Sequence, residues 1–285
     1  MNSYIGVEID AERLTMLADG PDDLIVRTAA TGRECELQHI VYEVEHFVAD
    51  LPYVPSGIGI GMPGLVVGTD KVELSHVIPA LSGATADLFA KRTGLPVAFI
   101  NDAKASTLAE AAHYPDRDTI AVVMIDTFIA SGVVVRGDLL LGAKGWSGEF
   151  GYMIMTTADG QPKPLDLLAS GYAIAHQSGL DAASISQKLA DGDAQLSAIV
   201  REAGAYLGYA LANLLHLYNP DALVIGGSTA RLPGYMEEAI NKLEAHALPE
   251  LFKCCSIASP KSSQYVTAFG AREWIRKLIS SPDKA

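Results

Sequence analysis

The sequence predicts an α/β fold, because short apolar segments rich in β-forming residues alternate along the chain with segments of helical periodicity. The periodicity is clear in residues 34–51, where Leu37, Ile40, Val41 and Val44 recur at the spacing of one helix face. We expect strands at residues 4–8, 57–61, 97–100, 119–125, 132–136 and 222–225, and helices at residues 34–51, 85–93, 103–113, 197–218, 233–246 and 266–279.

A similar order of elements occurs twice. Residues 4–28 resemble a three-stranded meander interrupted at residues 20–23, and residues 119–141 resemble paired hairpins that turn at residues 136–138. Each region is followed by a helix, an apolar strand and a second helix. The pattern fits an internal duplication and equally the self-similarity common among α/β chains. A domain boundary is expected in the polar run at residues 113–118.

Composition and charge exclude several classes of protein. The 285 residues suffice for one large domain or two of moderate size, and 49% hydrophobic residues exclude wholesale disorder. The formal net charge of −13 disfavours nucleic acid and anionic membrane surfaces as partners, because their phosphates would be repelled. The three cysteines lack zinc spacing, and neither a signal peptide nor a membrane-spanning run is apparent. We therefore expect a cytoplasmic protein.

The pair Asn101–Asp102 is a candidate catalytic site. It directly follows the apolar segment 97–100 and precedes the expected helix 103–113. Ligands of open α/β sheets bind at the carboxyl ends of strands, so a carboxylate here could be a general base. Asn and Asp are also good helix N-caps, and the local pattern by itself favours this structural role.

Two glycine-rich segments are further candidates. Residues 145–152 place three glycines and three aromatic residues around Glu149, which is typical of sugar sites and also of an ordinary glycine-rich connection. Gly226–Gly227 follows an apolar strand and indicates either a nucleotide contact or a simple turn. The string GIGMPG at residues 59–64 is not expected to bind a dinucleotide, because the chain after it is extended rather than helical.

Taken in order, these segments resemble the ROK family of sugar kinases (repressor, open reading frame, kinase). The matching segments are IGVEID, GIGIGMPGLV, GLPVAFINDAKASTLAEA, RGDLLLGAKGWSGEFGYM, LASG, LANLLHLYNPDALVIGGS and AFGA, which together extend from about residue 4 to residue 275. The resemblance implies a duplicated actin-like ATPase (ribonuclease H-like) fold with two α/β domains around a cleft. The implied domains are residues 1–117, with the C-terminal helix 268–285 packed back on them, and residues 118–267.

The same resemblance implies roles for individual residues. Asp102 would be the general base that takes the proton of the sugar 6-hydroxyl, and Asn101 and Glu149 would bind the sugar. Asp166, one methylene shorter than the family's glutamate, would bind it too. Tyr152, which would also bind the sugar, stands where most members have a zinc-binding histidine, and the family's cysteine motif is replaced by TTADGQPKP. We therefore expect no zinc, as in a subgroup resembling β-glucoside kinases. A homodimer is expected because many members form one.

The nucleotide motifs depart most from the family. Glu8 and Asp10 stand in the first phosphate motif, normally DxGGT, and both of its glycines are gone. The second motif, normally GTGxGGG, keeps Thr127 and Gly132 but has Asp126 and Phe128 in place of glycines. Gly226 and Gly227, on the adenosine side, are kept.

Mg-ATP is the implied cofactor, and two functions stay open. One is an ATP-dependent kinase acting on a hexose or β-glucoside. The other is a catalytically impaired homologue that binds a sugar or sugar phosphate as a sensor. The sequence also leaves open whether Glu8, Asp10 and Asp126 bind a metal, repel ATP or form a different site.

Overall fold

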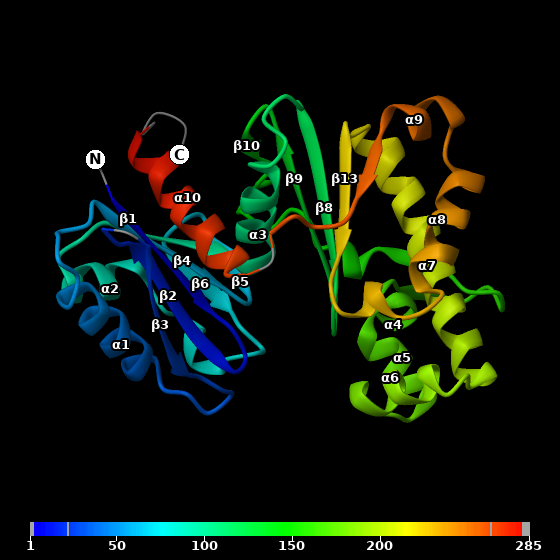
Figure 1. Ribbon diagram of the computed structural model, residues 1–285, viewed down its shortest axis with the longest axis horizontal. Coiled ribbons are helices and arrows are strands. Elements are labelled where there is room, and N and C mark those ends of the chain that lie inside the picture. The colour runs from blue at the N-terminus through cyan, green and yellow to red at the C-terminus, as the bar shows by residue number, and fades with distance from the viewer. Residues whose placement is uncertain (1–2, 22, 263, 281–285) are drawn as a thin grey trace. The chain divides into compact units, whose positions relative to one another are not determined.

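The computed structural model describes residues 3–21, 23–262 and 264–280, and the chain divides into two compact units (Figure 1). Unit 1 comprises Met1–His113, Leu139–Ser147 and Lys261–Ala285, and unit 2 comprises Tyr114–Asp138 and Gly148–Pro260. The domain boundaries expected from the sequence were 117/118 and 267/268. The units instead divide at 113/114 and 260/261, and residues 139–147 belong to unit 1.

Unit 1 is built on a five-stranded sheet in the order β3-β2-β1-β4-β7. Its antiparallel meander is β1 Tyr4–Ile9, β2 Arg13–Asp19 and β3 Leu24–Ala30, and β4 Gly57–Met62 and β7 Val97–Asn101 continue the sheet in parallel. Alternate residues Ile5, Val7 and Ile9 of β1 pack in one core with the apolar faces of α1 Leu37–Ala49 and α2 Ala86–Thr93. The opposite face is covered by α3 Asp102–Ala111 and α10 Val266–Ser280.

Glycines let α10 lie directly on this sheet. A Cβ atom added to Gly6 would overlap the carbonyl oxygen of Ala268, and one added to Gly59 would overlap that of Ala271. Gly270 of α10 lies equally close to the backbone of α3 at Ala105. The GIGMPG string is therefore a packing feature. After β4 the chain continues into β5 Leu65–Val67, which is extended, as the sequence indicated.

Unit 2 repeats the plan with a five-stranded sheet in the order β10-β9-β8-β13-β14. The strands are β8 Thr119–Ile125, β9 Ile129–Val135, β10 Asp138–Leu139, β13 Ala222–Gly226 and β14 Ser256–Ala258. β8 pairs antiparallel with β9 and parallel with β13, just as β1 pairs with β2 and β4 in unit 1. The shared strand order and directions favour duplication over chance self-similarity.

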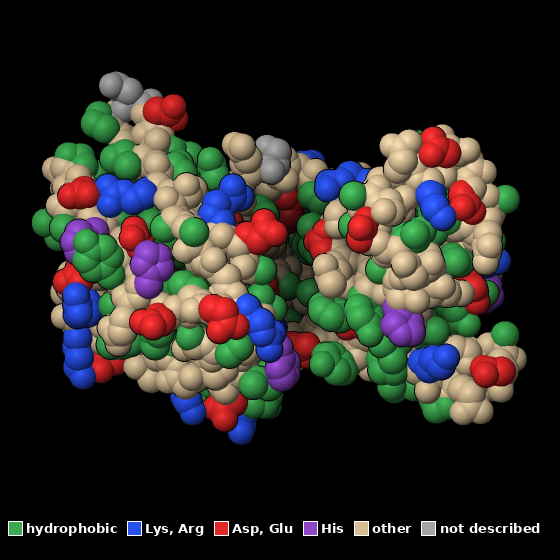
Figure 2. All heavy atoms as spheres, turned by 90° about the horizontal axis from the view of Figure 1, so that it is seen from below, with side chains coloured by type: hydrophobic (Ala, Val, Ile, Leu, Met, Phe, Trp, Pro, Cys, Tyr) green, Lys and Arg blue, Asp and Glu red, His purple; other side chains and the backbone are tan. Residues whose placement is uncertain are grey.

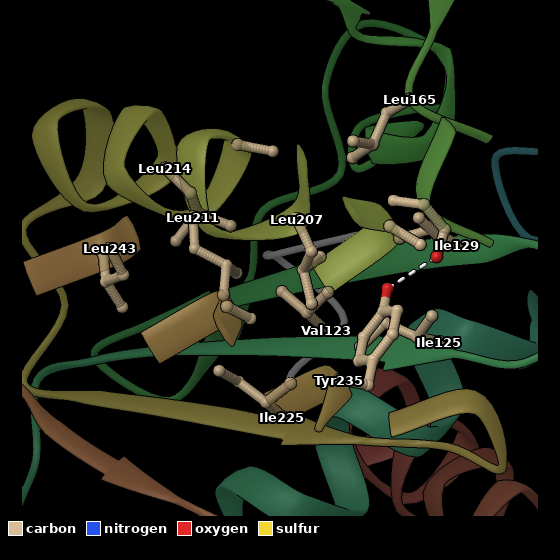
Figure 3. Close-up of a cluster of buried hydrophobic side chains, with 14 of the residues drawn as sticks. Val123, Ile125, Ile129, Leu165, Leu207, Leu211, Leu214, Ile225, Tyr235 and Leu243 are labelled. Atoms are coloured by element: carbon tan, nitrogen blue, oxygen red, sulfur yellow. Dashed lines mark hydrogen bonds between the residues drawn. The ribbon is translucent and has the colours of Figure 1, made fainter. Parts of the chain in front are cut away.

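The core of unit 2 lies between its sheet and the long helix α7 Ala194–Tyr218 (Figure 3). Leu207, Leu211 and Leu214 of α7 are fully or almost fully buried. They belong to one cluster with residues of β8 and β13 and with α8 Tyr235–His246. The Tyr235 side chain is fully buried, and its hydroxyl donates a hydrogen bond to the carbonyl oxygen of Ala169 at 2.5 Å, so its polar atom is satisfied.

Several short elements were not expected from the sequence. They are β6 Lys71–Leu74 and η1 Pro79–Leu81 in unit 1, and η2 Phe150–Tyr152, β11 Ile154–Thr156, β12 Pro162–Pro164, α4 Asp166–Ala169, α5 Gly171–Ser178, α6 Ala182–Ala190, η3 Thr229–Arg231, α9 Pro249–Cys254 and β14 in unit 2. Elements this short have too few residues to show a clear apolar period. β9 also begins three residues earlier than expected, because the turn before it occupies only residues 126–128.

Charged side chains are distributed over the surface. On the face shown in Figure 2, acidic and basic side chains are interspersed. Some of the charged side chains form exposed ion pairs, for example Lys91–Asp87 and Arg27–Asp50. Exposed ion pairs contribute little to stability. None of the helices in the described part of the chain is both long and apolar enough to span a bilayer.

Candidate active site

The carboxyl end of β7 carries Asn101 and Asp102 in unit 1. Asn101 is the N-cap of α3: its side-chain oxygen accepts the N–H of Lys104 at 3.3 Å, while its amide donates to the carbonyl oxygen of Gly64 at 3.1 Å. The structural role favoured by the local sequence therefore belongs to Asn101. Asp102 follows in the first turn of α3, where its Oδ1 accepts the N–H of Ala103 at 2.8 Å.

Asp102 is half-buried and electrostatically perturbed. Burial raises its pKa to about 6, and the nearby Glu8 carboxylate adds to the rise, while the N–H of Ala103 and the charge of Lys104 oppose it. Asp102 is therefore ionised at neutral pH and still a much better proton acceptor than an ordinary aspartate. A pKa near the working pH is what general base catalysis requires.

Glu8, at the end of β1, is linked to the Asp102 region through two hydroxyls. The Thr267 side chain interacts with the Glu8 carboxylate, and the Ser106 and Thr267 hydroxyl oxygens are 3.1 Å apart. Ser106 also donates to the carbonyl oxygen of Asp102 at 3.0 Å. Burial raises the pKa of Glu8 as well. The sequence did not indicate Ser106 or Thr267, because they come from α3 and α10, 161 residues apart.

This arrangement predicts the effect of replacing Glu8. In Glu8→Gln the negative charge near Asp102 is lost, so the pKa of Asp102 should fall below 6 while burial keeps it above the ordinary value of 3.8. If Asp102 must be ionised to react, the acid limb of the kcat/KM profile moves to lower pH. Glu12→Gln, which removes an exposed carboxylate in the neighbouring turn, should leave the limb in place. An unchanged limb in Glu8→Gln would contradict the coupling.

In unit 2, Glu149 and Asp166 interact electrostatically. Glu149 is exposed and precedes η2. Asp166 is half-buried and opens α4, where its Oδ1 accepts the N–H of Ile129 at 2.7 Å. Burial raises the pKa of Asp166, and the charge of Glu149 adds to this rise. A Cβ atom on Gly151 would overlap the Asp166 carboxylate, so this glycine makes room for it.

The other expected sugar contact, Tyr152, is 70% exposed at the end of η2. Its accessibility leaves the phenol ring and hydroxyl free to meet a ligand. Asp166 is less available to a ligand, because one of its two oxygens already bonds to the main chain.

The β1–β2 turn, where the first phosphate motif was expected, is closed by Asp10. Its Oδ1 accepts the N–H groups of Glu12 at 2.7 Å and Arg13 at 2.9 Å. The backbone of the turn is also held independently of this carboxylate. The Asp10 N–H donates to the Arg13 carbonyl oxygen at 2.9 Å, and the Thr31 hydroxyl donates to the Asp10 carbonyl oxygen at 2.8 Å.

Asp126 has the corresponding place in the β8–β9 turn of unit 2. Its Oδ1 accepts both the N–H and the hydroxyl of Ser228 at 2.6 Å. Ser228 follows Gly226–Gly227, and Gly227 has φ +106° with its Cα close to the backbone of Ile125. Ser228 was not predicted as a site residue, although its place directly after two glycines was the available signal.

Thr127 and Gly132 lie apart in the second motif. Thr127 is in the turn, and its carbonyl oxygen accepts the N–H of Tyr172 at 3.0 Å. Gly132 lies inside β9, opposite Val122.

The N–H groups of Glu12, Arg13, Ser228 and Ile129 are all bound to aspartate side chains. As they stand, these N–H groups are therefore not available to bind a phosphate group. Within the described residues, no three His, Cys, Asp or Glu side chains come together as a possible metal site.

A model of the ROK family matches residues 4–278. The chain belongs to the ROK family. It is 27% identical over 225 residues to the glucokinase of Halalkalibacterium halodurans, covering 68% of each chain. It is 31% identical over 160 residues to the bifunctional enzyme NanE/NanK of Brucella melitensis, covering 54% of this chain and 31% of that relative. The chain thus spans about a third of the length of this second relative.

Solved structures show the same fold. The ROK hexokinase from Thermus thermophilus superposes with a TM-score of 0.82 at 21% identity, covering 95% of this chain and 96% of that one. A ROK family glucokinase from Streptomyces griseus, in complex with glucose and AMPPNP, gives a TM-score of 0.75 at 20% identity, covering 97% of this ROK-family chain and 100% of the other. The duplicated fold implied by the resemblance is confirmed.

Proposed function

We propose that this ROK-family protein is a sugar kinase that phosphorylates a hydroxyl of a hexose or β-glucoside. The observation that carries the proposal is Asp102, a half-buried carboxylate just after the carboxyl end of β7, the parallel edge strand of the first sheet, with its pKa raised to about 6. Similarity to a glucokinase over 225 residues and to hexokinase and glucokinase structures supports the same activity. These comparisons give no support to the alternative of a sensor without turnover.

The proposal assigns a role to residues of each unit. In unit 1, Asp102 accepts the proton of the sugar hydroxyl as this oxygen becomes a nucleophile, and Asn101 binds a neighbouring hydroxyl. Asn101 is fixed by its hydrogen bonds to Gly64 and Lys104, so little side-chain freedom is lost on binding. In unit 2, the carboxylates of Glu149 and Asp166 accept hydrogen bonds from sugar hydroxyls, and Tyr152 offers an exposed ring.

A panel of hexoses, N-acetylhexosamines and β-glucosides tests the function. Each sugar is titrated into the pure protein by calorimetry and assayed with Mg-ATP for release of ADP and sugar phosphate in equal amounts. We expect at least one sugar to bind and to be phosphorylated. Binding of no sugar at millimolar concentration would refute the proposal. Sugar binding without phosphorylation would refute the kinase activity and would favour the alternative of a sugar-binding sensor.

Two further parts of the proposal come from the family resemblance. We expect the protein to be a homodimer, and we expect it to act in the cytoplasm. Sedimentation velocity of the full chain measures the first, and fractionation of its source cells measures the second. A monomer at micromolar concentration would contradict the dimer.

A further inference from the structure

Two turns at equivalent places in the duplicated fold each contain an aspartate whose carboxylate is hydrogen-bonded within its own unit. The β1–β2 turn follows the central strand of the first sheet and begins with Asp10, and the β8–β9 turn follows the central strand of the second and begins with Asp126. In both turns the aspartate Oδ1 accepts two hydrogen bonds, with distances of 2.6–2.9 Å. Three of the four donors are main-chain N–H groups, and the fourth is the Ser228 hydroxyl.

These donors are the kind that bind phosphate. Main-chain N–H groups converging at a turn form a concave anion site, and ligands of α/β sheets lie at the carboxyl ends of strands. Bonds from N–H groups to a carboxylate are charge-assisted and stronger than neutral ones. A phosphate oxygen that approaches either set of donors would therefore have to displace the bound carboxylate and would be repelled by its charge.

The carboxylates are not needed to shape the turns. The Asp126 carbonyl oxygen accepts the N–H of Gly171 at 2.8 Å and the hydroxyl of Thr229 at 2.9 Å, and these bonds do not involve the side chain. The Asp10 turn has its own main-chain closure to Arg13 and a bond from the Thr31 hydroxyl. A purely structural role of the two carboxylates would thus be partly redundant, because other hydrogen bonds already hold both turns.

We propose that Asp10 and Asp126 determine donor specificity: each is an internal anion that occupies main-chain N–H groups near the end of the central strand of its own unit, and each must be displaced before a phosphate group of a nucleoside triphosphate binds those groups. This inference rests on the proposed function, because it concerns the phosphoryl donor of that reaction. It accounts for carboxylates at two positions where the family's phosphate motifs have glycines.

The test is a comparison of affinities for Mg-ATP and for adenosine, measured by calorimetry on the full chain. We expect Asp10→Gly and Asp126→Gly each to tighten Mg-ATP binding by roughly 10-fold, the effect of removing one charge near a phosphate at a solvent-screened site. Adenosine carries no phosphate, so its affinity should change by less than about 2-fold on the same argument. Asp126→Asn keeps an acceptor for Ser228 but loses the charge, and its gain should be smaller than that of Asp126→Gly.

Asp159→Gly is the matched control. Asp159 is an exposed aspartate in the β11–β12 turn of unit 2, where it accepts hydrogen bonds from Thr157 and Gln161. Its replacement should leave the affinity for Mg-ATP unchanged. Circular dichroism establishes that each variant is folded. If Asp126→Gly is not folded, the Mg-ATP affinities of Asp10→Gly and Asp126→Asn test the inference.

The outcomes separate this inference from the proposed function. Tighter Mg-ATP binding with unchanged adenosine binding supports it. Unchanged Mg-ATP binding in the folded variants, or equal tightening of adenosine, overturns it even if sugars bind and are phosphorylated. Failure of every sugar to bind refutes the proposed function, whereas the ratio of Mg-ATP affinities still reports on the two aspartates.

Discussion

Asp102→Asn is expected to lower kcat for sugar phosphorylation by roughly 10²- to 10⁴-fold, the usual contribution of a general base. Asparagine has nearly the same shape as aspartate, and its oxygen can still accept the N–H of Ala103, so the start of α3 should be preserved. It cannot take a proton from a hydroxyl at neutral pH. We therefore expect sugar affinity, measured by calorimetry, to change much less than kcat.

Asp87→Asn is the control for this variant. Asp87 is also in the first turn of a helix, α2, but its side chain is exposed and pairs with Lys91 at 2.5 Å. The substitution removes the same charge from the same kind of position in unit 1, and kcat should stay within about 2-fold, as expected for a weak surface pair. If Asp102→Asn retained most of the activity, Asp102 would not be the base.

Gly59→Ala is expected to destabilise unit 1 by about 3 kcal/mol or more, the upper range for overpacking a close contact. The added Cβ would overlap the carbonyl oxygen of Ala271 in α10, which is a main-chain atom and cannot rotate away. β4 and α10 would have to separate, and the burial of Trp274 and Ile275 on α10 would be lost in part. Urea denaturation followed by circular dichroism measures the free energy of unfolding.

The comparison for this variant is Gly83→Ala. Gly83 has φ +83° and no atom within 4 Å of an added Cβ, so alanine there causes backbone strain without a clash. We expect a loss of about 1 kcal/mol, the usual strain of an L-residue in this region. A similar loss at both positions would mean that close packing of α10 on β4 contributes little.

The main strands and helices could be predicted because each has a strong local pattern. The segments at β8 and β13 are buried almost throughout and appear as apolar runs, and α1 carries an apolar stripe along one face. The helices between residues 166 and 190 could not be predicted in the same way. They are short, and their ends are defined by packing and by caps such as Ser170 and Asp181.

The candidate site was predictable only as a set of residue types. Asn101, Asp102 and Glu149 follow recognisable motifs, and their chemistry was inferred from these motifs. The raised pKa of Asp102 could not be predicted from the motifs, because it depends on burial and on Glu8, which lies on a different strand from the one that precedes Asp102. Asp166 was expected to bind the sugar, and the structure adds that one of its oxygens accepts the N–H of Ile129.

By itself, the sequence determined the alternation of strands and helices, the ROK family and the presence of carboxylates in both phosphate motifs. Local pattern and motif order are properties of neighbouring residues, so they can be inferred from the chain alone. Only the tertiary structure decided what those carboxylates bind. Asp126 meets Ser228 across 102 residues of chain, because β8 and β13 pair side by side in one sheet. Such a contact depends on strand order and register, which no local pattern encodes.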